Sequence, residues 1–173
     1  VKLRRHLGEF GGPAGRLRRL GNVTPLISIE GLETESDVRR GGHGVYGSAL
    51  EALRYCHENR LFTGVATSIS KNSIDDLVSD RFINEMARRG AHYLWYYIYR
   101  PVGPNPSPER ALDAEQILRL RRFIVDRRAT APLMIVDAYW DHEGRALCAA
   151  VSGIAHHVAP NGAVELCPVI QVA

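Results

Sequence analysis

The polar residues best placed for chemistry follow a short apolar run near the start of the chain. Residues 26–29 read LISI, which suits a buried strand, and Glu30 with Gly31 ends that strand. In parallel α/β folds, the residues at the carboxyl end of a strand and in the loop after it face the active site. Ser28, Glu30 and Arg40 are therefore the predicted site residues of this stretch.

A second polar cluster, made of Asp137, Asp141 and His142, follows a later predicted strand. Two carboxylates and an imidazole can bind a metal or serve in general acid–base catalysis, and they are also typical of a solvated loop. One alternative function is therefore a stand-alone α/β lyase that uses Glu30, Asp137 and His142. Such an enzyme would be active with no iron present.

The apolar periodicity predicts the elements that must position these residues. We expect strands within residues 26–29, 61–69, 91–99 and 132–139, and helices over 45–60, 72–89 and 114–128, the second with a break near Ser79. Strands that begin about 30–40 residues apart, with helices between them, indicate βαβ crossovers and a parallel sheet. The stretch from Gly31 to Gly44 is interpreted as a polar loop with a glycine-rich turn, and residues 16–20 as a helix end capped by Gly21.

The predicted fold class is α/β, a partial (half) TIM-type barrel with about four parallel strands and outer helices. A closed barrel is excluded because it needs about 250 residues. Asn161 and Gly162, between two short apolar runs, predict a small β-hairpin extension. The expected organisation is a partial helix and connection over residues 1–24, the half barrel over 25–140 and the extension over 141–173.

Composition and charge limit the class of protein. The 173 residues are 45% hydrophobic and 24% charged, as in globular domains, and the net charge of +3 is too small to indicate a nucleic-acid partner. The apolar runs are shorter than the roughly 20 residues that span a bilayer, so no membrane partner is expected. Three cysteines form no dense disulfide framework, which favours a cytoplasmic location. A basic module that binds nucleic acid through residues 4–19, with a strong salt dependence, is the alternative from another class.

Several short motifs, taken in order, resemble the middle of the radical SAM superfamily. The pattern there runs S-[IVL]-[DE]-G, D-x-x-R, G-x-G-x-[FY], a helix, a strand and N-x-x-[DE]-[LV]. The matching residues of this chain are Ser28, Glu30, Gly31, Asp37, Arg40, Gly42, Gly44, Tyr46, Asn72, Asp75 and Leu77. The later segment LWYYIYRPVG is similar to one branch of the superfamily. The resemblance covers about residues 25–168.

The tail resembles a different part of that superfamily. Cys148 and Cys167, with Gly162 between them, are similar to the start of the SPASM or twitch extension. This resemblance implies that the two cysteines begin the binding site of an auxiliary iron–sulfur cluster. The alternation of strands and helices changes after Trp140, which places the start of this extension at about residue 141.

The chain departs from the superfamily in its defining motif. The C-x3-C-x2-C that binds the catalytic cluster is absent from these residues, and Gly11-Gly12 is followed by Pro13 in place of a glutamate. The resemblance therefore implies the second half of a radical SAM barrel, which we expect to be inactive in isolation. Its first strand would expose an unpaired edge, so the chain should self-associate unless residues 1–21 cover that edge.

The resemblance also implies cofactors and roles for the site residues. The cofactors would be S-adenosylmethionine and a [4Fe-4S] cluster whose ligands are not in this chain. Ser28 and Glu30 would contact the ribose and methionyl groups, and Arg40 or its neighbour Arg39 would bind the cofactor carboxylate. Arg100, at the exit of the third strand, would be a further contact. The enzyme would abstract hydrogen with a 5′-deoxyadenosyl radical, and SPASM members often modify peptides or proteins.

Overall fold

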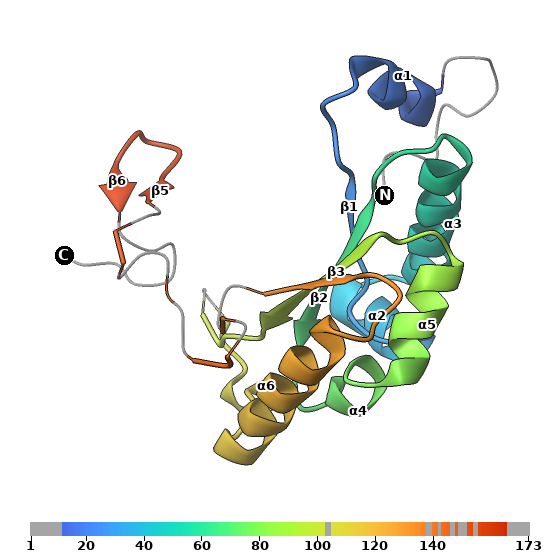
Figure 1. Cartoon of the computed structure of the whole chain (residues 1–173). Coiled ribbons are helices and arrows are strands. Elements are labelled where there is room, and N and C mark those ends of the chain that lie inside the picture. Colours follow the sequence, from blue (N-terminus) through green and yellow to red (C-terminus); the bar gives the residue numbers. More distant parts are fainter. Residues whose placement is uncertain are drawn as a thin grey trace.

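The computed structural model describes residues 12–102, 105–137, 140–141, 143–145, 148, 152–153 and 156–165. The helices within these residues are α1 Pro13–Leu20, α2 Glu33–Arg40, α3 Val45–Glu58, α4 Ile74–Leu77, α5 Asp80–Arg88, the 3-10 turn η2 Pro108–Arg110 and α6 Ala114–Arg128. The strands are β1 Leu26–Ser28, β2 Gly64–Ile69, β3 Tyr93–Ile98, β4 Met134–Val136, β5 His157–Val158 and β6 Val164–Glu165. Strands β1 to β4 form one parallel sheet in chain order, and β5 pairs with β6 in an antiparallel hairpin (Figure 1). The predicted α/β class with four parallel strands and a hairpin is confirmed.

The core lies between one face of the sheet and the helices. Figure 1 shows α3, α5 and α6 on the same side of the strands. One register row of the sheet faces them, and it consists of Ile27, Val65, Leu94 and Ile135. Three members of that row are buried, and Ile27 packs against the same core. The amphipathic helices and the alternating strands therefore form one helix-covered layer, as a barrel wall does.

The other face of the sheet is open in the part of the chain that the structure describes. On this face, the first row of paired residues at the amino ends of the strands consists of Leu26, Gly64, Tyr93 and Met134. Leu26 is 41% exposed and Met134 is 58% exposed. The Tyr93 ring lies over β2, where a Cβ on Gly64 would come within 2.1 Å of it. Large apolar side chains on an uncovered sheet face are what a half barrel would show.

Strand β1 forms one edge of the four-stranded sheet. The Ile29 N–H donates to the Ala66 carbonyl at 2.9 Å, so by alternation the backbone groups of Leu26 and Ser28 point away from β2. Helix α1 lies beyond the amino end of β1 (Figure 1), and its Ala14 and Leu17 join Cys56, Leu61 and Ile27 in a small apolar cluster. Self-association through the outer edge of β1 stays a prediction, and residues 1–11, part of the segment that was expected to cover it, lie outside the described residues.

The interpretation of residues 31–44 as a polar loop is wrong, because most of the stretch forms α2. Acidic residues in its first turn and Arg39 with Arg40 in its last turn complement the helix dipole. Gly41, at a φ of 68°, then ends the helix in the left-handed conformation. The only buried residue of α2 is Ser36, so the helix lacks the apolar stripe by which periodicity would reveal it.

The other helix boundaries follow the predicted signals. Ser79 separates α4 from α5, and its hydroxyl accepts the Phe82 N–H at 3.2 Å as an N-cap. Asp113 begins α6 through a reciprocal capping box with Gln116. Gly21 ends α1 at a φ of 76°, as expected for a C-cap glycine. None of the described helices is long and apolar enough to cross a bilayer.

Candidate functional site

Glu30 lies at the carboxyl end of β1 and is only 8% exposed. Its Oε2 accepts the Ser68 N–H at 3.0 Å and lies 3.3 Å from Nη1 of Arg39. Its Oε1 accepts a hydrogen bond from Nη2 of Arg40. The Glu30 N–H donates to the Ser36 hydroxyl at 3.3 Å. This buried carboxylate is therefore the centre of a polar cluster formed by β1, α2 and β2.

Ser28 and Arg40 meet in a neighbouring cavity of about 420 Å³. Apolar side chains from α1, β1 and α3 form its other walls, and the Arg40 side chain keeps 40% of its exposure. Because Arg40 also bonds Glu30, the structure brings together three of the four predicted cofactor contacts. The size lies within the range of roughly 300–1,000 Å³ that is usual for small-molecule sites.

Arg100 lies apart from this cluster. It follows the end of β3, two strands away from β1, and it is exposed. Its carbonyl accepts the Val102 N–H at 2.9 Å in a local turn. Its position at a strand's carboxyl end agrees with the sequence prediction, and a role in binding stays a prediction.

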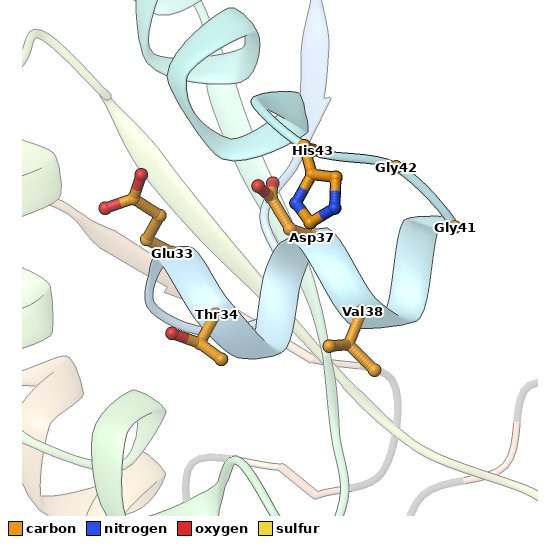
Figure 2. Close-up of a pocket in the computed structure, with 7 residues that line it drawn as sticks. All are labelled: Glu33, Thr34, Asp37, Val38, Gly41, Gly42 and His43. Carbon is orange, nitrogen blue, oxygen red and sulfur yellow. The ribbon is translucent and has the colours of Figure 1, made fainter.

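Another pocket, of about 480 Å³, lies along the part of α2 that carries Glu33, Thr34, Asp37 and Val38 (Figure 2). Glu33, Asp37 and His43 are among its polar lining residues. The Asp37 carboxylate is already engaged, since it accepts the N–H groups of Gly44 at 2.6 Å and Tyr46 at 2.8 Å.

These bonds give Asp37 a structural role at the start of α3. The Tyr46 N–H is the main cause of the lowered pKa of Asp37. The stabilisation is therefore present above the ordinary carboxyl pKa and is lost as the pH falls through the lowered one. Asp37, the first residue of the D-x-x-R match, accepts N–H groups at the start of α3, whose N-cap is Gly44, and is not part of the Glu30 cluster.

Asp137 is held by an arginine of α6 rather than presented to a ligand. Its side chain is fully buried and accepts from Nη2 of Arg128, while its Oδ1 accepts the Trp140 N–H at 2.9 Å. Arg128 also donates to the carbonyls of Trp140 at 3.1 Å and Asp141 at 2.9 Å. The network ties the exit of β4 to α6, which suits a structural anchor.

Asp141 is likewise engaged in a local turn. Its carboxylate accepts the N–H groups of Glu143 and Arg145, both at 2.9 Å, and Nε of Arg145 at 2.8 Å. The bond from the Arg145 N–H contributes most to lowering the pKa of Asp141 to about 2. His142, the third member of the predicted cluster, lies outside the described residues. Among those that are described, no group of three histidine, cysteine or acidic side chains could hold a metal.

Of the two predicted cluster cysteines, Cys148 is exposed and has a free thiol. Its carbonyl accepts both the N–H and the hydroxyl of Ser152 at 3.1 Å. Cys167 lies outside the described residues. The hairpin between them has the predicted turn, with Gly162 at a φ of 85° and its N–H donating to Ala159 at 2.8 Å.

Sequence reasoning missed two members of the Glu30 cluster. Ser68 takes part through its backbone N–H, and a backbone contact leaves no signal in the residue type. Ser36 lies on a helix that was interpreted as a loop. Arg39 was considered only as a substitute for Arg40, whereas its side chain is the more buried of the two, at 12% exposed.

The fold and this cluster define a parallel α/β domain with charged side chains at its carboxyl strand ends. No protein-family model matches the chain. The chain is 28% identical over 135 residues to sporulation killing factor maturation protein SkfB of Bacillus subtilis (strain 168), covering 73% of this chain and 30% of that protein. It is 26% identical over 134 residues to Fe-coproporphyrin III synthase of Methanosarcina barkeri (strain Fusaro / DSM 804), covering 74% and 34%.

The chain thus spans about a third of the length of these curated relatives. Both relatives are radical SAM enzymes, and the similarity supports a distant relationship of this chain to the radical SAM superfamily. S-adenosylmethionine and a [4Fe-4S] cluster are the cofactors that this relationship implies for the family.

Proposed function

We propose that this chain is the second half of the barrel of a radical SAM enzyme, over residues 25–140, followed by the start of a SPASM or twitch extension. Ser28, Glu30 and Arg40 are the proposed contacts to S-adenosylmethionine, and Arg100 is a fourth contact farther along the sheet. When bound with its iron–sulfur cluster, S-adenosylmethionine supplies the radical chemistry of that superfamily. The observation that carries the proposal is the cavity that Ser28 and Arg40 line beside the buried Glu30.

The residues present fit the cofactor in chemical type. The Arg40 guanidinium offers a donor fork for a carboxylate, and its 40% exposure leaves it within reach of a ligand. The Ser28 hydroxyl can donate to and accept from a ribose hydroxyl. Glu30 can accept from a hydroxyl or an ammonium group. The apolar walls of the cavity suit the uncharged surface of a nucleoside.

The proposed substrate class is a peptide or protein. The name of the Bacillus relative describes the maturation of a killing factor, which supports this choice, whereas that of the Methanosarcina relative describes synthesis of a porphyrin. The lyase alternative has less support, because the Asp137 carboxylate that it would use is buried against Arg128.

Binding of S-adenosylmethionine tests the proposed contacts. Ser28→Ala, Glu30→Gln and Arg40→Gln should each weaken binding by roughly two- to hundredfold, since each removes a hydrogen bond worth about 0.5–3 kcal/mol. The affinity is measured by calorimetry on the natural protein that contains these residues. Ser48→Ala is the control, because Ser48 is a partly exposed residue of α3 outside the cavity and its hydroxyl bonds the Gly44 carbonyl. Unchanged affinity in all three variants would remove these residues from the site.

We also propose that Cys148 and Cys167 are ligands of an auxiliary iron–sulfur cluster. Thiolates are the usual ligands of such clusters, and two of the customary four would come from this chain. After anaerobic reconstitution, the natural protein should hold more iron than a single cluster explains. Replacing both cysteines by alanine should reduce the iron to the single-cluster value. Equal iron in the wild type and the double variant would assign the two thiols to structure alone.

A further inference from the structure

The two oxygens of Glu30 have partners of different kinds. Oε2 accepts a backbone N–H from Ser68 at 3.0 Å and lies 3.3 Å from the guanidinium of Arg39. Oε1 accepts from Arg40, whose side chain is 40% exposed against 12% for Arg39. One oxygen is therefore held by buried groups and the other by a side chain that reaches solvent.

Arg39 and Glu30 together continue the sheet beyond the end of β1. In a parallel sheet, the N–H and C=O of one residue point to the same neighbouring strand. At Ser68 of β2, the N–H bonds Glu30 and the carbonyl accepts from Nη1 of Arg39 at 2.6 Å. Two side chains thus occupy the places that β1 backbone would fill, which fixes Glu30 relative to β2.

Arg39 is itself held in place on its other side. Its guanidinium carbon lies 5.6 Å from the centre of the Tyr99 ring, just after β3, a distance suited to a cation–π contact. One side chain of α2 therefore contacts the carboxyl ends of three successive strands. Hydrogen bonds in which one partner is charged are about twice as strong as neutral ones, so this arrangement resists displacement.

Arg40 lacks such anchors among the contacts of the described residues. Arg40 lines the cavity and bonds Glu30 with a side chain that is 40% exposed, and ion pairs near solvent contribute little stability. A hydroxyl or ammonium group of a ligand can replace Arg40 at Oε1. The guanidinium thus released can then bind an anionic group of the same ligand.

We infer that Arg39 is a positioning residue, which locks Oε2 of Glu30 onto β2 so that only Oε1, with its exchangeable partner Arg40, is offered to a ligand. The inference rests on the proposed function, because the orientation of Glu30 matters for activity only if Glu30 contacts the cofactor. It assigns different tasks to two arginines that are neighbours in the sequence and identical in residue type.

Amide hydrogen exchange at Ser68 tests the lock without any ligand. Arg39→Lys should speed exchange of the Ser68 N–H at least tenfold. Nη1 of Arg39 contacts both the Ser68 carbonyl and Glu30, and the nitrogen of a lysine lies one bond nearer the backbone and does not reach this position. The exchange of Leu94, in the buried core, should stay unchanged. Arg40→Lys, the matched control, should leave Ser68 exchange within twofold of wild type. If both variants or neither changed Ser68 exchange, the lock would be refuted.

A second variant guards against a loss of folding in Arg39→Lys. Tyr99→Leu removes the ring beside the guanidinium but keeps the bonds to Glu30 and Ser68, so it should speed Ser68 exchange in the same direction and by less. Unchanged exchange at Ser68 in this variant would count against the lock as well.

A double-mutant cycle separates positioning from mere structural support. Arg39→Lys should weaken S-adenosylmethionine binding at least fivefold in the wild-type protein and have no further effect when Glu30 is already glutamine. Additive losses would overturn the inference that Arg39 acts through Glu30. Unchanged binding in Ser28→Ala and Glu30→Gln would instead overturn the proposed function, and the exchange of Ser68 would still report on the lock.

Discussion

Replacing Arg128 by methionine is expected to lower the free energy of unfolding by about 3 kcal/mol. Methionine keeps much of the side-chain volume but removes the guanidinium from the buried Asp137 carboxylate and from the carbonyls of Trp140 and Asp141. A buried charge without its ion-pair partner is far more costly than the intact pair is stabilising. Urea denaturation measures the change, with equal slopes for wild type and variant as the check on two-state unfolding.

The neighbouring arginine provides a matched control. Arg127 forms a bidentate pair with Asp80, with distances of 2.5 and 2.9 Å, but both partners lie at the surface. Arg127→Met should therefore change the stability much less than Arg128→Met. Adding Asp137→Asn to Arg128→Met should restore part of the loss by removing the buried charge. No recovery in this double variant would show that the charge is not the cause.

Gly31→Ala is expected to destabilise the protein by about 2–4 kcal/mol and to weaken cofactor binding as well. Gly31 follows Glu30 at a φ of 157°, and a Cβ there would lie 2.9 Å from Cβ and 3.0 Å from Cγ of Glu35. Neither atom is the free end of a flexible chain, so α2 would have to move. Since α2 carries Arg39 and Arg40, the displacement should disturb their hold on Glu30.

Gly41, at the opposite end of α2, is the control for the backbone strain that any side chain causes at a positive φ. Its φ is 68° and a Cβ would meet nothing within 4 Å, so Gly41→Ala should cost only the left-handed strain of about 1 kcal/mol. Its affinity for S-adenosylmethionine should match that of wild type. Equal losses of stability and of affinity in the two variants would contradict the proposed collision with Glu35.

Local signals predicted most of the fold. The four strands, the long helices and the hairpin turn follow from apolar periodicity, from signals such as the helix break at Ser79 and from the Asn161–Gly162 pair. Element ends were less accurate: a strand was expected from Leu61, but β2 begins at Gly64. The Leu61 N–H instead bonds the Cys56 carbonyl near the end of α3, and its side chain packs against α1. Helix α2 was missed because it rests on strand ends through Ser36 and arginines rather than through an apolar stripe.

The sequence by itself determined that Ser28 and Glu30 would lie at the end of a parallel strand, because strand order and alternation depend on local pattern. It also placed two arginines within reach of them. Successive residues of a helix point about 100° apart, so which arginine enters the strand ends depends on where α2 packs. Only the tertiary structure decided that Arg39 is buried against Ser68 and Tyr99 while Arg40 borders the cavity. Packing also decided that Asp137 pairs with Arg128. That contact depends on how α6 lies against the end of β4, which the local pattern of neither segment specifies.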